Sequence, residues 1–315
     1  MSDAKPQVHW VTIDEGAHEQ RLDNFLLCHF KTCPKSLIYK IIRTGQVRVN
    51  KKRAEAKTRL ATGDIIRIPP VKVESSSDKP ILLKDEFKQE IAAAILHEDD
   101  AIMVINKPAQ WAVHGGSNLH FGLIEALKTM YGPSMELAHR LDKETSGCLL
   151  IAKTKSALRQ LHQQFRADQI NKVYDLWVHG RWPKRLNKIQ APLKKVHHLK
   201  GGWQVYVNPE GKPSLTTFEA IQTHEQWSHV RARLKTGRTH QIRVHSLHAG
   251  HPILGDPKYA STQIHQTYAN ILNLKRMALH ARELSFTHPS NSKLFKIEAP
   301  LDDDLINLRN QLEQL

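Results

Sequence analysis

The sequence has few cysteines, no long apolar run and a shortage of acidic residues. Its cysteines number three and are scattered, at Cys28, Cys33 and Cys148. An odd, sparse set excludes a disulfide framework and indicates a reducing compartment. No apolar run approaches the roughly 18 residues of a membrane helix, and the polar segment from Met1 to Gln7 lacks the apolar core of a secretory signal. We therefore expect a cytoplasmic protein that does not associate with membranes.

The shortage of acids leaves a strong positive charge. The 315 residues include 46 lysines and arginines against 31 aspartates and glutamates, a formal net charge of +15. This excess indicates a polyanionic partner, most simply a nucleic acid. A membrane surface would require a basic amphipathic helix with an aromatic face, and the sequence shows no convincing example. The length suits one large domain or two ordinary ones.

The positive charge is concentrated between Lys31 and Leu60, where ten basic residues stand against one acid, Glu55. Apolar spacing predicts a helix near Arg21–Leu27 and a second helix after Pro34, followed by short strands. Mutual repulsion among so many cations has no structural use, so we expect an RNA-binding surface. Its candidate contacts are Lys35, Arg43, Arg48, Lys51, Lys52 and Arg53.

The remainder of the chain predicts a second, larger domain. We expect a small α/β domain over 19–70, a flexible linker over 71–90 that is rich in serine and charge, and a catalytic domain over 91–315. Predicted strands in 91–315 outnumber helices and rarely alternate with them. This pattern favours an α+β domain around a largely antiparallel mixed sheet over a doubly wound parallel one.

The densest motif lies between His139 and Lys153. Its second half, Cys148 to Ala152, is a short apolar run that predicts a buried strand. The loop before it carries Asp142 among the candidate cations His139, Arg140 and Lys143. Neighbouring positive charge keeps a carboxylate ionised, so Asp142 could act as a nucleophile, a base or a metal ligand. Residue types alone also allow a plain turn made by Asp142 and Thr145.

A second dense motif, Leu234 to His245, is rich in histidine and continues to His248 and His251. A zinc site is not expected here, because Gly250 breaks the helix between His248 and His251 and no cysteine cluster is near. The sequence also lacks a phosphate-binding glycine loop and a dinucleotide fingerprint. We therefore expect neither a metal nor a cofactor.

Together these motifs resemble one family. The string from His139 to Gly147 resembles the H-R-L-D-x-x-T-S-G signature of the Rlu-type (RluA-family) pseudouridine synthases, and Gly237 to His245 resembles its G-R-T-H-Q-I-R-x-H motif. Further blocks at Asn106–Gly116, where Trp111 departs from the usual pattern, and at Met277–Pro289 follow in the family's order. The basic stretch resembles the small RNA-binding module first named from ribosomal protein S-four.

The resemblance implies the pseudouridine synthase fold and a set of roles. Asp142 would be the nucleophile, Arg238 would form an ion pair with it, and Tyr174 would stack on the target base. Arg140, Lys143 and His139 would contact the RNA around the flipped nucleotide. Two alternatives stay open: Arg238 could bind phosphate instead, and Tyr174 could be an ordinary strand aromatic.

The implied activity is site-specific isomerisation of uridine to pseudouridine. The stretch Lys212–Ser214 resembles most the RluC branch, which acts on large-subunit (23S) ribosomal RNA, so we expect that RNA or its assembly intermediate as partner of a monomeric enzyme. The alternatives are action on transfer RNA and a non-catalytic ribosome-associated protein. A metal-dependent nuclease using Asp142 and Glu144 is disfavoured because too few acids cluster there.

Overall fold

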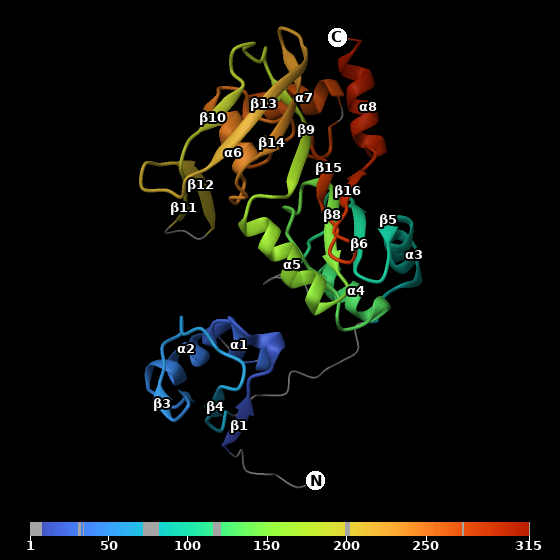
Figure 1. The fold of residues 1–315 in the computed structure, drawn as a ribbon. Helices are drawn as coiled ribbons and strands as arrows, with labels where there is room; N and C mark the ends of the chain where they lie inside the picture. Colours follow the sequence, from blue (N-terminus) through green and yellow to red (C-terminus); the bar gives the residue numbers. More distant parts are fainter. Residues whose placement is uncertain are drawn as a thin grey trace. The chain divides into compact units, whose positions relative to one another are not determined.

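The computed structural model describes residues 8–30, 33, 35–71, 82–115, 121–198, 202–272 and 274–314. The chain divides into two compact units, Met1–Pro80 and Ile81–Leu315, and each is described by itself (Figure 1). Within the described ranges, no helix is both long enough and apolar enough to cross a bilayer.

The N-terminal unit packs two helices on a small antiparallel sheet. Its elements are β1 (His9–Thr12), η1 (Glu15–Ala17), α1 (Leu22–His29), α2 (Lys35–Arg43), β2 (Arg48–Val49), β3 (Lys52–Arg53) and β4 (Ile65–Ile68), with strand order β1-β4-β2-β3. Leu22, Leu26 and Ile38 from the helices are fully buried with Ile66 from the sheet. The unit begins earlier than the predicted residue 19, because β1 pairs with β4 along its whole length.

The C-terminal unit is built on a ten-stranded sheet of order β10-β13-β14-β9-β15-β8-β6-β5, with β16 on β15 and β7 on β8. The strands are β5 (Ile95–Glu98), β6 (Ile102–Lys107), β7 (Glu136–Leu137), β8 (Ser146–Ala152), β9 (Asn171–His179), β10 (Lys188–Gln190), β13 (Leu215–Thr223), β14 (Trp227–Leu234), β15 (Leu279–Thr287) and β16 (Leu294–Glu298). Among these described strands only β15 and β8 pair in parallel, which confirms the expected α+β class with a largely antiparallel sheet.

Helices and one separate hairpin complete this unit. They are α3 (Asp85–Ala93), α4 (Leu123–Tyr131), α5 (Lys155–Arg166), α6 (Gln241–His248), α7 (Thr262–Leu272), α8 (Asp303–Leu312) and the hairpin of β11 (Leu193–His197) and β12 (Trp203–Val207). Helix α3 corrects the predicted linker over 71–90, since Ile91 is fully buried and Phe87 packs on Trp111. Residues 72–81 of that linker lie outside the described residues.

Strand β8 lies between two parts of the core. Leu149 and Ile151 join the larger hydrophobic cluster, whereas Cys148 and Leu150 join the cluster beneath α5. Burial on both faces explains the continuous apolar run, because successive side chains of a strand point in opposite directions. The loop that precedes β8 is therefore mounted on a strand that is buried along its whole length.

Candidate active site

The loop before β8 opens into a cavity of about 640 Å³. Its walls come from this loop, from β9, from α5 and from the segment that leads into α6. They include Arg140, Asp142, Phe165, Lys172, Tyr174, Arg238, His240 and Arg243. The structure thus gathers Asp142, Tyr174 and Arg238, three residues far apart in the sequence, around one hollow.

A buried lysine anchors the loop that carries Asp142. Lys107 ends β6 with none of its surface exposed, and its Nζ donates to the carbonyl oxygens of Pro108 (2.8 Å), Trp111 (3.0 Å) and Lys143 (3.2 Å). Burial lowers the pKa of Lys107 to about 7. The residue after Asp142 is therefore held to β6, a role that sequence reasoning did not assign to Lys107.

Arg243 is the guanidinium that faces Asp142. Its Nη1 lies 3.8 Å from Asp142 Oδ2, and its Nε and Nη2 donate to the buried Asp256 carboxylate at 2.7 and 2.8 Å. Burial raises the pKa of Asp142, while the positive charge of Arg243 opposes that rise. Asp256 thus fixes the arginine, and the arginine favours an ionised Asp142.

This geometry corrects the predicted partner of Asp142. Arg238 is exposed, and its Nε donates to the carbonyl oxygen of Pro213 at 3.2 Å. Arg238 precedes α6, whereas Arg243 lies inside that helix with a side chain only 2% exposed. Both arginines belong to one motif, so the sequence alone did not distinguish which of them faces inward.

His240 is a second group near the carboxylate that the sequence did not single out as a site residue. Its Nε2 lies 3.8 Å from Asp142 Oδ2, and its Nδ1 is 2.8 Å from the Tyr259 hydroxyl. Burial, followed by the charges of Arg243 and Lys258, lowers the pKa of His240 to about 3. The ring therefore stays neutral beside Asp142.

Tyr174 enters the cavity from β9, where it pairs with Ala232 of β14. Its residue surface is only 7% exposed, and burial raises the pKa of its phenol above the ordinary value. The next residue, Asp175, points to the opposite face of the strand. It accepts hydrogen bonds from Arg231 (3.0 Å) and Arg282 (3.1 Å). Tyr174 therefore presents a protonated, rigidly mounted ring to the cavity.

The three predicted cations of the loop do not share one environment. Arg140 and Lys143 are exposed. His139 instead accepts a hydrogen bond from the Leu150 backbone N–H at 3.1 Å, and burial lowers its pKa to about 4. The assumption that His139 is a cation is therefore corrected, since its ring is neutral.

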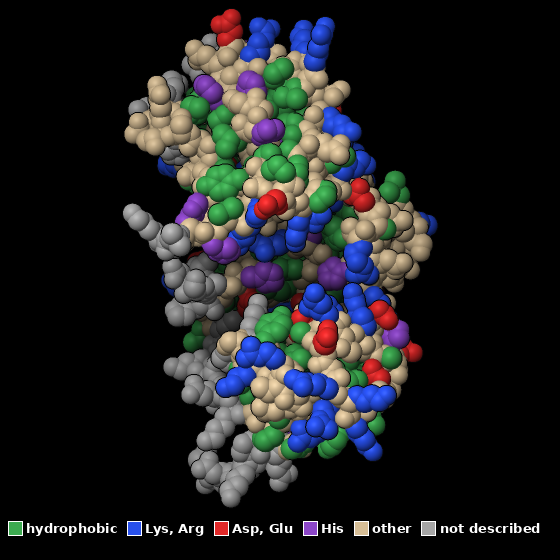
Figure 2. All heavy atoms as spheres, turned by 90° about the vertical axis from the view of Figure 1, so that its left-hand side faces the viewer, with side chains coloured by type: hydrophobic (Ala, Val, Ile, Leu, Met, Phe, Trp, Pro, Cys, Tyr) green, Lys and Arg blue, Asp and Glu red, His purple; other side chains and the backbone are tan. Residues whose placement is uncertain are grey.

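The basic residues of the N-terminal unit lie on its surface. Arg43, Arg48, Lys51, Lys52 and Arg53 are all exposed, while the side chain of Lys35 lies outside the described residues. Lys and Arg outnumber Asp and Glu on the face of this unit that Figure 2 shows. Such a face is suited to an extended polyanion.

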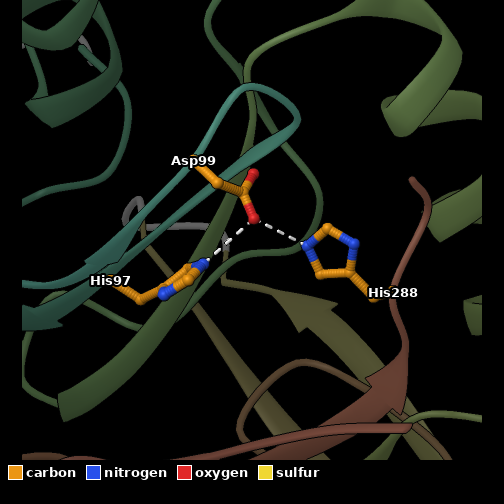
Figure 3. Close-up of side chains that lie close together, drawn as sticks. All are labelled: His97, Asp99 and His288. Carbon is orange, nitrogen blue, oxygen red and sulfur yellow. Dashed lines mark hydrogen bonds and ion pairs between the residues drawn. The ribbon is translucent and has the colours of Figure 1, made fainter. Parts of the chain in front are cut away.

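Among the described residues, one group of His97, Asp99 and His288 has the composition of a metal site. Both Nε2 atoms lie near Asp99 Oδ2, at 3.1 Å from His97 and 2.8 Å from His288 (Figure 3). However, the Ser290 N–H donates to His288 Nδ1 at 3.2 Å, so the proton of the neutral ring resides on Nε2 and points at Asp99. A metal on that nitrogen would have to displace this proton and the Ser290 bond. The group is better explained as a set of hydrogen bonds that joins β5 to the end of β15.

Family models match both units. Residues 101–248 match the model for RNA pseudouridylate synthase, and residues 20–66 match the S4 domain. The chain is 46% identical over 307 residues to the ribosomal large subunit pseudouridine synthase C of Yersinia pestis, which covers 97% of this chain and 96% of that relative. It is 42% identical over 320 residues to the protein of the same name from Vibrio cholerae, which covers all of both chains.

A solved structure shares the fold. The human RNA Pseudouridylate Synthase Domain Containing 4 superimposes with a TM-score of 0.58 at 24% identity, and the match covers 72% of this chain and 96% of that one. At this identity the likeness concerns the fold alone.

Proposed function

The chain belongs to the RNA pseudouridylate synthase family, as its motifs predicted, and we propose that it converts specific uridines of large-subunit ribosomal RNA into pseudouridine with Asp142 as nucleophile. The substrate is proposed from the names of the relatives that match over nearly the whole chain. We also propose a cytoplasmic location, because a ribosomal RNA substrate supports it.

The observation that carries the proposal is a carboxylate that lines a cavity and faces a buried guanidinium. Isomerisation breaks the bond between uracil N1 and the ribose and forms one between C5 and the same ribose carbon, while C5 loses a proton and N1 gains one. No water or electron is consumed. An ionised Asp142 can begin this exchange by attacking the sugar or the base, and Arg243 at 3.8 Å favours the ionised form.

Tyr174 and the exposed cations are proposed to handle the nucleotide itself. The target base must leave its stack to reach Asp142, at a cost of a few kcal/mol. The aromatic ring of Tyr174 lines the cavity, and this position supports a stacking role. Arg140 and Lys143 are exposed beside Asp142, where they can bind phosphates and offset that cost.

For Arg238 we propose a phosphate contact. A second cavity of about 470 Å³ shares the segment 237–239 with the first and is lined by Lys194, Lys195 and Lys212. Arg238 therefore lines both cavities and is exposed to solvent. The second cavity also contains Glu210, which pairs with Lys194 and leaves Lys195 and Lys212 as the other cations on its wall. A strand whose target nucleotide occupies the first cavity could place a flanking phosphate in the second.

The test is Asp142→Asn, assayed by mapping pseudouridine in large-subunit RNA incubated with each protein. An amide is a poor nucleophile, so we expect no product and unchanged RNA affinity. Asp168→Asn is the matched control, because Asp168 is an exposed carboxylate on the wall of the same cavity without the proposed role, and it should retain turnover within about tenfold. Residual activity of Asp142→Asn above about a thousandth of the wild-type rate would refute Asp142 as nucleophile.

A further inference from the structure

We propose that His240 is a positioning residue whose neutral imidazole directs its Nε2–H at the Asp142 carboxylate, and that Tyr259 determines which ring nitrogen carries the proton. The inference rests on the proposed function, because it takes Asp142 as the reacting group. It adds a second hydrogen-bond donor to Asp142, besides Arg243. It also gives the buried Tyr259 a role, which is to set the tautomer of His240.

The hydrogen bonds of Tyr259 assign the proton. The Val205 N–H donates to the Tyr259 hydroxyl oxygen at 3.2 Å, and His240 Nδ1 lies 2.8 Å from the same oxygen. Tyr259 is 5% exposed, and among the described residues Nδ1 is the only acceptor within reach of its hydroxyl proton. The phenol therefore donates to Nδ1, so the proton of the neutral ring lies on Nε2. That nitrogen faces Asp142 Oδ2 at 3.8 Å.

The surroundings keep the ring neutral. The charged groups that face it are Arg140 and Asp142 from the loop before β8, Lys195 from β11, Arg243 from α6 and Lys258 from the loop after α6. Cations outnumber the single carboxylate, and Trp203 covers the ring at a centroid distance of 4.9 Å. Burial and these cations together disfavour a second ring proton. A neutral donor can approach the carboxylate without losing its proton to it.

The backbone of His240 is in an unfavourable conformation that aims the ring. Its φ of 54° is left-handed, which costs conformational energy for any residue other than glycine. The conformation is held from both sides, since the His240 carbonyl accepts the Val244 N–H at 3.0 Å and the ring is held by Tyr259. Such strain persists where the surrounding structure determines it, and it is typical of functional sites.

One buried carboxylate organises both donors that face Asp142. Asp256 binds the Arg243 guanidinium and also accepts the backbone N–H of Tyr259 at 3.1 Å. Arg243 Nη1 is buried without a hydrogen-bond partner among the described residues. This Nη1 lies 3.5 Å from Glu144 Oε2 and 3.8 Å from Asp142 Oδ2, and His240 Nε2 lies 3.8 Å from the same Oδ2. In the proposed arrangement both nitrogens donate to Oδ2 when Asp142 turns toward them, which would leave its other oxygen to attack.

The proton assignment is tested by NMR on the full chain labelled with 15N in histidine. The His240 signals are identified by their absence from His240→Gln. We expect the Nε2–H tautomer in the wild type from pH 5.5 to 8, and its loss in Tyr259→Phe, which keeps the ring but removes the hydroxyl. An Nδ1–H tautomer or a cationic ring in the wild type would overturn the proposal.

Kinetics test the role. Glutamine can place an N–H near the position of Nε2 and leucine cannot, so His240→Leu should lower kcat about a hundredfold at unchanged RNA Kd, while His240→Gln should recover at least tenfold of that loss. Equal kcat for the two variants, or a change in Kd alone, would reduce His240 to a packing role. If His240→Leu does not fold, Tyr259→Phe carries the test, with an expected tenfold loss in kcat.

Different results would refute the nucleophilic role of Asp142 and the positioning role of His240. An active Asp142→Asn protein would refute the proposed function itself. An inactive Asp142→Asn beside fully active His240→Leu and Tyr259→Phe would refute only the role of His240.

Discussion

The charge at Asp142 depends on two residues from a distant part of the sequence, Arg243 and Asp256. Asp256 is fully buried and holds Arg243 through two hydrogen bonds, and Arg243 in turn faces Asp142. A buried ion that loses its partner is costly, since neither water nor another charge replaces it. The arginine therefore serves stability through Asp256 and the chemistry through Asp142.

Substitution of the two arginines of the motif should have different effects on stability and on RNA binding. Arg243→Met leaves Asp256 buried and unpaired, so it should lower the free energy of unfolding by about 3–5 kcal/mol and abolish turnover. Arg238→Met removes an exposed side chain, so it should weaken RNA binding and leave stability nearly unchanged. Urea unfolding and RNA titration measure both effects.

A double-mutant cycle sharpens this prediction. Combining Asp256→Asn with Arg243→Met should recover part of the lost stability, because no lone carboxylate remains. A coupling energy below about 0.5 kcal/mol would contradict the pair, and so would equal destabilisation by Arg238→Met.

Asp175 should give the protein a measurable sensitivity to acid. Burial alone would raise its pKa, but His229, Arg231 and Arg282 outweigh burial and hold the pKa well below the ordinary value. A depressed carboxyl pKa contributes stability that is present above the unfolded pKa, near 4, and is lost as the pH falls below it. The unfolding free energy of the wild type should exceed that of Asp175→Asn by about 1.5–3 kcal/mol at pH 7. That difference should shrink by about 0.5–1 kcal/mol at pH 3.5, and a difference independent of pH would contradict the assignment.

At the scale of elements, the site depends on how β8 enters the sheet. Gly147 has a φ of +107°, and a Cβ there would lie 2.2 Å from the carbonyl oxygen of Ala281 on the parallel neighbour β15. Only glycine allows the two strands to approach this closely. The loop that carries Asp142 is thereby placed directly before the β8–β15 contact.

Gly147→Ala should therefore be strongly destabilising, and Gly132→Ala is the matched control. Gly132 has nearly the same φ, +108°, but open space around the position of a Cβ. Both variants pay backbone strain of about 1–3 kcal/mol, and Gly147→Ala adds an overpacking cost of about 1–3 kcal/mol. Thermal unfolding compares them, and equal destabilisation would show that the approach to β15 is unimportant.

At the scale of the whole molecule, the chain separates a basic unit from the unit that holds the cavity. The first contains the exposed cations between α2 and β4, and the second contains every residue proposed for chemistry. Because each unit has its own buried core, the two roles should be separable by experiment.

Deleting Met1 to Ser75 should leave a folded C-terminal unit that binds RNA more weakly and with a flatter salt dependence, because counterion release scales with the number of phosphates bound. Within the full chain, changing Lys51, Lys52 and Arg53 to glutamine should reduce the salt slope by up to about 2–3, since each phosphate that a cation neutralises adds about 0.7–0.9 to the slope. Truncation with an unchanged slope would exclude the N-terminal unit as an RNA anchor.

Much of the local structure follows from patterns within short stretches of the sequence. The apolar run at Cys148–Ala152 is β8, the periodic stretch at Lys155–Arg166 is α5, and Asp142 lies at the strand end where its motif placed it. These features depend on alternation, helical spacing and turn chemistry, which act between near neighbours in the chain.

The electrostatic roles, by contrast, depend on how distant segments pack together. Arg243 rather than Arg238 faces Asp142, His139 is neutral instead of cationic, and His240 became a candidate through Tyr259. Charge and protonation depend on burial and on groups brought together from distant segments. The arginine that faces Asp142 lies about a hundred residues further along the chain. Its position depends on the side of α6 that faces the loop before β8, and the local sequence does not determine that side.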